Sequence, residues 1–320
     1  MATPRRGRIV ILGLPYFGRM LEGLLRGRGW DARFVAHPGR SPRGWLALAP
    51  LVARADIIYL IGSRIDRNCP QDILMRLRRR PVVIHWVGTD VLIATEEHAK
   101  GNVSKRIARR AVHWCDASWL VDELRAFGVR AAHVPLPIPG LATGDPPPLP
   151  DRFRALLYLP VDAFDREVFD QATLLRLPLE FPGIEFTLIP SPRETLPVPV
   201  PANLTARGWV DDIDALYREM TAVVRLTSHD GMSFMALEAL SRGRYVIWTH
   251  PLPGAIQASG FDAVVAALRG LVERHEAGQL SLNTTGQESV LHEFDFERLL
   301  ADLDQRLAAL PRRRTRSRAR

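Results

Sequence analysis

Glu238 is a carboxylate within an apolar run in the second half of the chain, and Asp230 is a second carboxylate nearby. Asp230 precedes Gly231, and Glu238 follows eight positions after Asp230 within an apolar run that favours a helix. A buried, unpaired carboxylate is costly, so Glu238 requires a partner, and the two vicinal hydroxyls of a ribose would provide one. Glu238 therefore indicates a binding site for a nucleotide.

The start of the same helix suits the diphosphate of such a nucleotide. A helix N-terminus presents unpaired N–H groups and a partial positive charge, and Gly231, Met232 and Ser233 lead into it. Glu238 lies about 7.5 Å further along the axis at ~1.5 Å per residue, which places a ribose attached to the diphosphate within its reach. The alternative is that Glu238 faces solvent and Asp230 is an ordinary turn or cap residue.

The elements around this pair form one strand, helix, strand unit. AVVRLT (222–227) has the length and composition of a strand, residues 233–240 have helical spacing, Gly243 ends the helix, and YVIW (245–248) resumes a strand. Upstream, strands are predicted over 155–160, 184–190 and 203–210, with helices over 165–177 and 212–220. This alternation predicts a doubly wound domain over 151–288.

The first half repeats the pattern. Apolar strands over 8–14, 31–37, 55–62 and 81–88 alternate with helices, as in a parallel sheet covered on both faces. We therefore predict an α/β chain with two Rossmann-like domains, the first over 1–137. A proline-rich linker (138–150), an amphipathic C-terminal helix (289–310) and a disordered basic tail (311–320) complete the prediction.

Composition limits the classes of function. No apolar run approaches the roughly 20 residues of a transmembrane helix, and the first residues hold only a six-residue apolar stretch where a signal peptide needs a longer one. We therefore expect a cytoplasmic protein. Cys69 and Cys115 have no metal-ligand spacing. Residues 1–140 hold 23 Lys or Arg against 11 Asp or Glu, whereas 141–310 hold 14 against 24. This asymmetry argues against a surface that coats nucleic acid uniformly and indicates two domains with different partners.

Residues 208–247, GWVDDIDALYREMTAVVRLTSHDGMSFMALEALSRGRYVI, resemble the retaining family 4 group of GT-B glycosyltransferases. The resemblance rests on the G-W-V strand end, the tyrosine-bearing helix and an acid and a glutamate with seven residues between them. VGTDV (87–91) is similar to the H-G-T-D segment of that family, with Val87 at the histidine position. His85 lies two residues earlier and shares a strand face with Val87, although it is equally well explained as a core histidine.

The resemblance implies two domains that face each other across a cleft, and a role for each candidate residue. The catalytic candidates are His85, Asp90 and Asp230; the donor-binding candidates are Gly13, Arg166, Gly231, Met232, Ser233 and Glu238; the acceptor-binding candidates are Tyr16, Phe17 and Gly18, which belong to the glycine loop GLPYFG (13–18). No metal and no cofactor are implied. Simple turn chemistry is the alternative for the glycine loop.

Two departures from the family pattern concern the donor. The resemblance implies that the first acid, here Asp230, contacts the hydroxyls of the donor sugar, and Asp230 is one methylene shorter than the glutamate usual at that position. Segment 156–170, where the family carries an arginine and a lysine for the diphosphate, contains Arg166 but no lysine, and Arg193 is a second candidate. Solvated surface roles are the alternative for both arginines.

The resulting hypothesis is a hexosyltransferase that moves a sugar from a nucleotide-diphosphate donor to a glycan, lipid-linked glycan or small-molecule acceptor, with retention. The main alternative is a glycosyltransferase-like binding or scaffold protein without turnover; a nucleic-acid-binding protein is a weaker rival because no such motif is present. The basic segments 76–81 and 100–110 also suit peripheral contact with an anionic membrane at its inner face, or a solvated arginine-rich surface.

Overall fold

The computed structural model describes residues 6–36, 41–67, 69–77, 80–162, 168–197 and 199–311. The chain divides into two compact units, the first formed by residues 1–137 with 297–320 and the second by residues 138–296. Each unit contains a parallel sheet flanked by helices, which confirms the predicted α/β class with two Rossmann-like halves.

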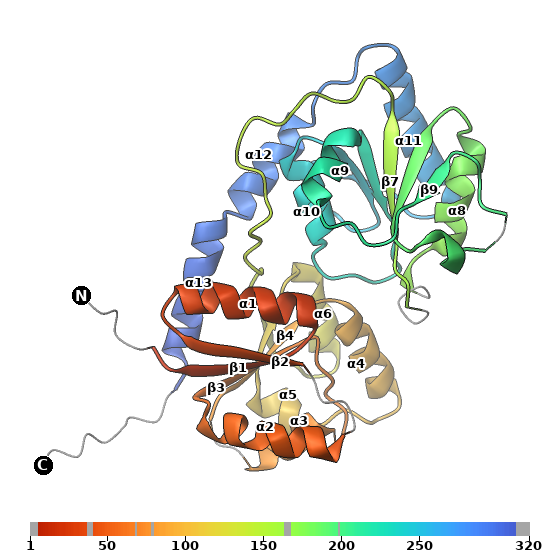
Figure 1. Cartoon of the computed structure of the whole chain (residues 1–320). Coiled ribbons are helices and arrows are strands. Elements are labelled where there is room, and N and C mark those ends of the chain that lie inside the picture. Colours follow the sequence, from red (N-terminus) through yellow and green to blue (C-terminus); the bar gives the residue numbers. More distant parts are fainter. Residues whose placement is uncertain are drawn as a thin grey trace, which may run out of the picture. The chain divides into compact units, whose positions relative to one another are not determined.

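The first unit has the strand order β2-β1-β3-β4-β5-β6 among its described residues, with every neighbouring pair parallel. The order reverses between β1 and β3, and α1 lies on one face of the sheet while α2 and α3 lie on the other (Figure 1). The strands are β1 Arg8–Gly13, β2 Asp31–Ala36, β3 Ile57–Ile61, β4 Val82–Trp86, β5 Val112–Cys115 and β6 Ala131–His133. The helices are α1 Pro15–Gly27, α2 Pro42–Arg54, α3 Pro70–Leu77, α4 Thr89–Ala99, α5 Lys105–Arg110, α6 Ser118–Ala126 and α13 Phe296–Ala309.

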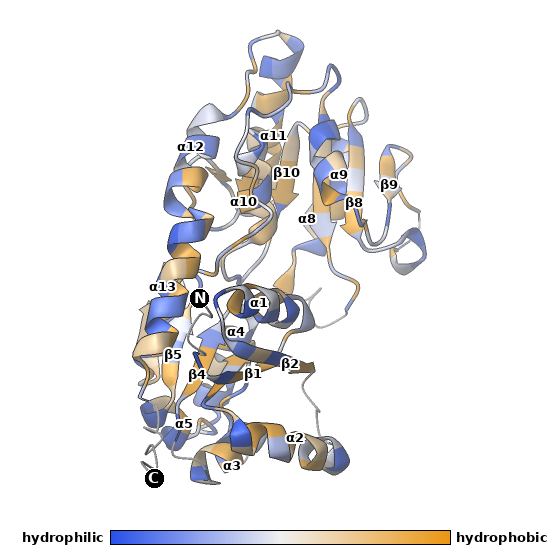
Figure 2. Cartoon of the chain, turned by 60° about the vertical axis from the view of Figure 1, so that its left-hand side comes forward, coloured by the Kyte–Doolittle hydropathy of each residue, from blue (hydrophilic) through white to orange (hydrophobic). Residues whose placement is uncertain are grey.

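Helix α13 returns to the first unit from the far end of the sequence. Figure 2 shows it as alternating hydrophilic and hydrophobic segments, as expected of an amphipathic helix. Its Asp304 is buried, and Oδ1 accepts hydrogen bonds from Arg6 Nη1 at 2.6 Å and from the indole nitrogen of Trp30 at 2.8 Å. These contacts fix the helix on the unit that contains β1.

The prediction of one continuous helix over 289–310 is wrong. Helix α12, Thr284–Glu293, ends before α13 begins at Phe296. Phe294 leaves the helical conformation with φ −110° and ψ 34° while its ring is buried. Asp295, which follows, is of a type favoured immediately before a helix. The amphipathic pattern continues through the break, so periodicity alone conceals it.

The second unit has the strand order β12-β11-β10-β7-β8-β9 among its described residues, again with parallel neighbours. The strands are β7 Arg154–Leu159, β8 Glu185–Pro190, β9 Leu204–Ala206, β10 Ala222–Arg225, β11 Tyr245–Trp248 and β12 Ile256–Gln257. The helices are α8 Gln171–Glu180, the 3-10 helix η1 Arg193–Thr195, α9 Ile213–Glu219, α10 Phe234–Ser241, α11 Phe261–Glu276 and α12. The order reverses between β7 and β10.

Alternate strand residues divide the core of the second unit between two helical layers. Ala155, Leu157 and Leu159 of β7 belong to one apolar cluster with residues of α8 and α11. Side chains alternate along a strand, so the neighbouring residues Leu156 and Val223 face the opposite side, where α10 packs on β10 and β11 (Figure 1). Helix α10 is thereby held at the point where the strand order reverses.

The segment predicted as a linker, residues 138–150, lies on the second unit without forming a helix or strand. The carbonyl oxygen of Gly140 accepts a hydrogen bond from Arg242 at 3.1 Å, and that of Pro148 accepts from Arg244 at 3.2 Å. The backbone N–H of Ala142 donates to Ser241 Oγ at 3.1 Å. Residues 138–150 are therefore attached along their length to the end of α10.

Candidate functional site

The loop between β10 and α10 lies at the carboxyl end of the second sheet, where its strand order reverses. In open parallel sheets this is the position at which ligands bind. The loop ends in Ser233, whose hydroxyl accepts a hydrogen bond from the backbone N–H of Ala236 at 3.2 Å and caps α10. The predicted helix start is confirmed, and so is its end, because Gly243 has a left-handed φ of +67°. Gly231 and Met232 precede Ser233 in the same loop.

Glu238 lies one turn inside α10 and has a partner within the protein. Its Oε2 accepts a hydrogen bond from the hydroxyl of Tyr217, on α9, at 3.0 Å. Burial raises the pKa of Glu238, although the tyrosine hydroxyl and Arg242 oppose this shift. Gly140 lies beside the carboxylate, since a Cβ added there would be 3.1 Å from Oε1. The helix therefore presents a half-buried, pre-oriented carboxylate with one oxygen towards the tyrosine.

Asp230 forms a two-pronged ion pair with Arg225, the last residue of β10. Arg225 Nε lies 2.7 Å from Oδ2 of Asp230, and Nη2 lies 3.2 Å from Oδ1. Both side chains are largely buried, with 13% and 14% exposed. The guanidinium also lies over the rings of Tyr158 and Phe169, at 4.9 and 5.0 Å from their centroids. Asp230 is thus held by a cation rather than left free in the loop.

Arg225 is a cation at the carboxyl edge that the sequence reasoning missed. Burial lowers its pKa, but the charge and hydrogen bonds of Asp230, together with the hydroxyls of Tyr158 and Tyr217, outweigh this effect, so the pKa lies above its usual value. A charged residue ending the otherwise apolar strand AVVR, with an acid five positions on, was the available signal. Arg166, the predicted donor-binding arginine, lies outside the described residues, and Arg193 is exposed on η1.

In the first unit, Asp90 occupies the start of α4 at the carboxyl end of β4. Its Oδ1 accepts hydrogen bonds from the backbone N–H groups of Val87 and Val91, both at 3.0 Å. The second oxygen, Oδ2, is buried and has no hydrogen-bond partner among the described residues. Burial raises the pKa of Asp90 to about 7, and the backbone N–H groups oppose this shift. Asp90 therefore titrates near neutral pH.

His85 lies in the core rather than on a surface that a substrate can reach. The ring is fully buried, its Nδ1 is hydrogen-bonded to the hydroxyl of Tyr59, and it packs edge-to-face with Trp114. Burial lowers the pKa of His85 to about 3, while the backbone of Val134 opposes the shift. The ring is neutral at physiological pH, and the structure favours the core alternative over the catalytic assignment.

The glycine loop predicted over 13–18 is mostly helix. Helix α1 begins at Pro15, because proline at the first helical position has the right φ and no N–H to leave unpaired. Tyr16 is exposed, Phe17 is half-buried, and the two rings pack edge-to-face at 5.4 Å. Gly18 is buried, and a Cβ there would lie 2.3 Å from the ring of Phe34. This close packing explains a glycine at position 18, and its acceptor-binding role stays a prediction.

Gly13 ends β1 beside β3, where the strand order of the first sheet reverses. Its φ is +130°, and an added Cβ would lie 1.8 Å from the carbonyl oxygen of Ile61. The glycine is required for the close approach of two neighbouring strand ends. The structure shows this packing role for Gly13, and its place near a phosphate stays a prediction.

No cluster of three or more His, Cys, Asp or Glu side chains within the described residues is arranged to hold a metal ion. None of the helices described combines the length and the apolar character that crossing a bilayer requires.

Comparison with known proteins relates this arrangement to glycosyltransferases. No protein-family model matches the sequence, and no curated protein matches it either. Among the solved structures that are similar in fold are the following three. The Anabaena protein HepE, in complex with UDP-glucose, superposes with a TM-score of 0.68 at 12% identity, over 95% of this chain and 100% of that chain. Sucrose-phosphate synthase from Thermosynechococcus elongatus gives 0.70 at 12% identity, over 94% and 98%. The calicheamicin glycosyltransferase CalG4 gives 0.52 at 14% identity, over 96% and 99%.

These likenesses extend over nearly the whole of each chain and include both sheets, whereas the sequence resemblance is specific over about 40 residues. At such low identities they establish the fold and leave the chemistry to the residues. The chain has the GT-B fold of the glycosyltransferases.

Proposed function

We propose that the chain is a glycosyltransferase that moves a sugar from a nucleotide-diphosphate donor, bound by the second unit, to an acceptor bound by the first. The observation that carries the proposal is the grouping of Glu238, the start of α10 and Arg225 at the carboxyl edge where the strand order reverses. The solved structure of HepE with UDP-glucose, which shares the fold, supports a donor of this class.

Each group has a defined part in holding the donor. The carboxylate of Glu238 accepts the ribose hydroxyls, and the hydroxyl of Tyr217 fixes its orientation at 3.0 Å. The partial positive charge and the backbone N–H groups at the start of α10 bind the diphosphate. Arg225 supplies the positive charge that a lysine in segment 156–170 would otherwise provide. The diphosphate then competes with Asp230 for the guanidinium of Arg225.

Transfer then depends on positioning and electrostatics. Negative charge develops on the leaving diphosphate, and the helix N–H groups with Arg225 stabilise it in a largely water-free environment. From the family resemblance we propose a hexosyl donor, retention of anomeric configuration and no resident metal. From the same resemblance we keep Asp90 as the catalytic candidate of the first unit.

A calorimetric titration with UDP-, GDP-, ADP- and TDP-glucose tests donor binding. Glu238→Gln should weaken binding of the preferred donor by about tenfold or more, because a hydrogen bond to a charged group contributes about 1.5–3 kcal/mol. The matched control is Glu219→Gln on α9, whose side chain is 47% exposed. Absence of binding to all four donors, in a protein that unfolds cooperatively, would contradict the proposal.

The Asp230–Arg225 pair favours one second candidate, a donor-binding protein without turnover. In that case Asp230, the carboxylate expected to contact the donor sugar, remains paired with Arg225 when the donor is bound. Release of nucleoside diphosphate from the preferred donor, measured with a panel of glycan and small-molecule acceptors, separates the two. Donor binding that Glu238→Gln weakens, without release of nucleoside diphosphate by transfer or by hydrolysis, would assign the protein to the second candidate.

A further inference from the structure

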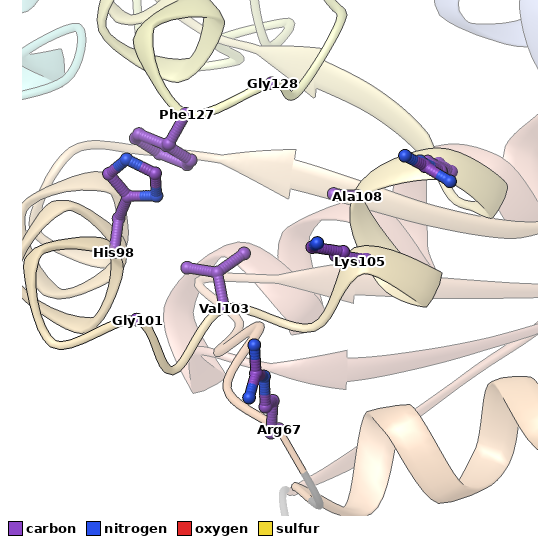
Figure 3. Close-up of a pocket in the computed structure, with 9 residues that line it drawn as sticks. Arg67, His98, Gly101, Val103, Lys105, Ala108, Phe127 and Gly128 are labelled. Carbon is purple, nitrogen blue, oxygen red and sulfur yellow. The ribbon is translucent and has the colours of Figure 1, made fainter.

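A cavity of about 300 Å³ lies in the first unit, with three cationic side chains on its lining. Arg67, Lys105 and Arg109 are here called the basic pocket. Figure 3 shows Arg67 and Lys105 directed into the same hollow from two different segments of the chain. The backbone joins these segments, since Arg67 N–H donates to the carbonyl oxygen of Asn102 at 2.8 Å. The fold therefore brings Arg67 to the same cavity as the two cations of α5, from which it is distant in sequence.

The three cations have no counter-charge within the described part of the chain. Their side chains make no hydrogen bond or ion pair with any described residue, and no carboxylate lines the cavity. The acids near this region are bound to other cations. Asp66 pairs with Arg64 at 2.7 Å and Glu97 pairs with Lys100 at 3.1 Å. Like charges gathered without compensation repel one another, so the pocket is suited to an anion.

Helix α5, KRIARR, divides its basic residues between two faces. Arg110 donates to the carbonyl oxygen of Met75 at 2.9 Å, and Arg106 lies 3.7 Å from Asp72, so both serve contacts with α3. Lys105 and Arg109, four residues apart, share the other face, as i and i+4 positions do, and line the cavity. The contacts on the α3 side fix the helix and leave the two remaining cations for a ligand.

The rest of the lining is apolar and aromatic. Val103 and Phe127 are largely buried, and the His98 ring lies 5.4 Å from that of Phe127, tilted by 31° (Figure 3). A phosphate monoester carries about two negative charges at neutral pH and three strong acceptor oxygens, which match several cations around one hollow. We propose that the basic pocket binds the phosphate group of an organic phosphate ester, whose organic part contacts Val103 and Phe127.

This site is separate from the candidate donor and acceptor residues. The pocket lies at the edge of the sheet where β5 and β6 begin, and it is lined from the last turn of α4, from α5 and from the end of α6. Asp90 lies at the opposite edge, where β4 ends. The inference therefore does not rest on the proposed function. The ester can be a soluble metabolite or the head group of a phospholipid, since both present the same chemistry.

The test measures binding of two probes to the full chain. Glycerol 3-phosphate is titrated by calorimetry, and sedimentation measures association with phosphatidylcholine vesicles that contain phosphatidic acid. The variants are Lys105→Ala, Arg109→Ala and the charge reversal Arg109→Glu. Arg130→Ala is the matched control, because Arg130 is exposed in the same unit, loses the same charge and does not line the cavity. Unfolding temperatures establish that each variant is folded.

Each single alanine variant should weaken binding about fivefold, and the charge reversal should weaken it more than about tenfold, because these residues contact the phosphate directly. Arg130→Ala should leave binding unchanged, because salt screens an exposed charge that makes no direct contact. Binding of glycerol 3-phosphate with this pattern supports a soluble ester, and vesicle association alone with this pattern supports a phospholipid. Binding of neither probe, or an equal loss in Arg130→Ala, would overturn the proposal.

Discussion

The carboxyl group of Asp90 should make the free energy of unfolding depend on pH, and one substitution should remove that dependence. Burial raises the pKa of this group from 3.8 to about 7. One pKa unit corresponds to about 1.4 kcal/mol, so the linkage between protonation and folding amounts to about 4 kcal/mol. The folded protein holds this proton more tightly than the unfolded chain. The stabilisation is therefore fully present below pH 3.8 and is lost as the pH rises through about 7.

The assay is urea unfolding of the wild type and of Asp90→Asn at pH values from about 4 to about 8. Asparagine keeps an oxygen for the backbone N–H groups of Val87 and Val91 but cannot ionise. The free energy of unfolding of the wild type should fall relative to that of the variant by up to about 4 kcal/mol across this range. Asp122→Asn, at a 74% exposed side chain, is the matched control. A difference between wild type and Asp90→Asn that stays constant with pH would refute the reasoning.

Two further substitutions test the packing of the first unit. Gly13→Ala should cost more than about 3 kcal/mol of unfolding free energy, because the added Cβ would lie 1.8 Å from a carbonyl oxygen of β3 at a φ of +130°. Gly23→Ala, in open space on α1, is the control and should stabilise the protein by about 0.5 kcal/mol. Equal effects of the two substitutions in denaturant titrations would contradict the close approach at Gly13. Asp304→Ala should cost about 2–3 kcal/mol by leaving the buried indole N–H of Trp30 without its acceptor, whereas Asp302→Ala, which breaks an exposed pair on the same helix, should cost less than about 1 kcal/mol. A comparable loss in both would show that α13 is not fixed through Asp304.

Much of the fold could be predicted because its information is local. Buried parallel strands are continuous apolar runs, and RIVILG and IIYLI became β1 and β3 with boundaries within one or two residues of the prediction. Helix α10 was predictable from Ser233 as its cap and Gly243 as its stop. The start of α1 was also readable, since Pro15 is a signal for the first helical position, but the glycines on either side favoured a loop.

The partners of the site residues could not be predicted, because they depend on how distant segments meet. Tyr217 reaches Glu238 from α9, and no pattern in the sequence specifies that contact. Arg225 and Asp230 are five residues apart, yet their pairing depends on the path of the loop that joins β10 to α10. Burial of His85 could not be predicted either. Its position near a motif made it a catalytic candidate in the sequence, but the structure encloses its ring in the core.

The attachment of α13 makes the order of synthesis matter for the first unit. Arg6 and Asp304 are separated by 298 positions, so this contact forms only after the entire second unit has been translated. Until then the indole N–H of Trp30 lacks the acceptor on Asp304. The surface of the first unit on which the apolar face of α13 packs is also exposed until then. Long-range contacts of this kind slow folding and prolong exposure to aggregation. Expression of the first half alone would produce a permanently unfinished domain, so any dissection of this protein has to carry residues 297–311 with it.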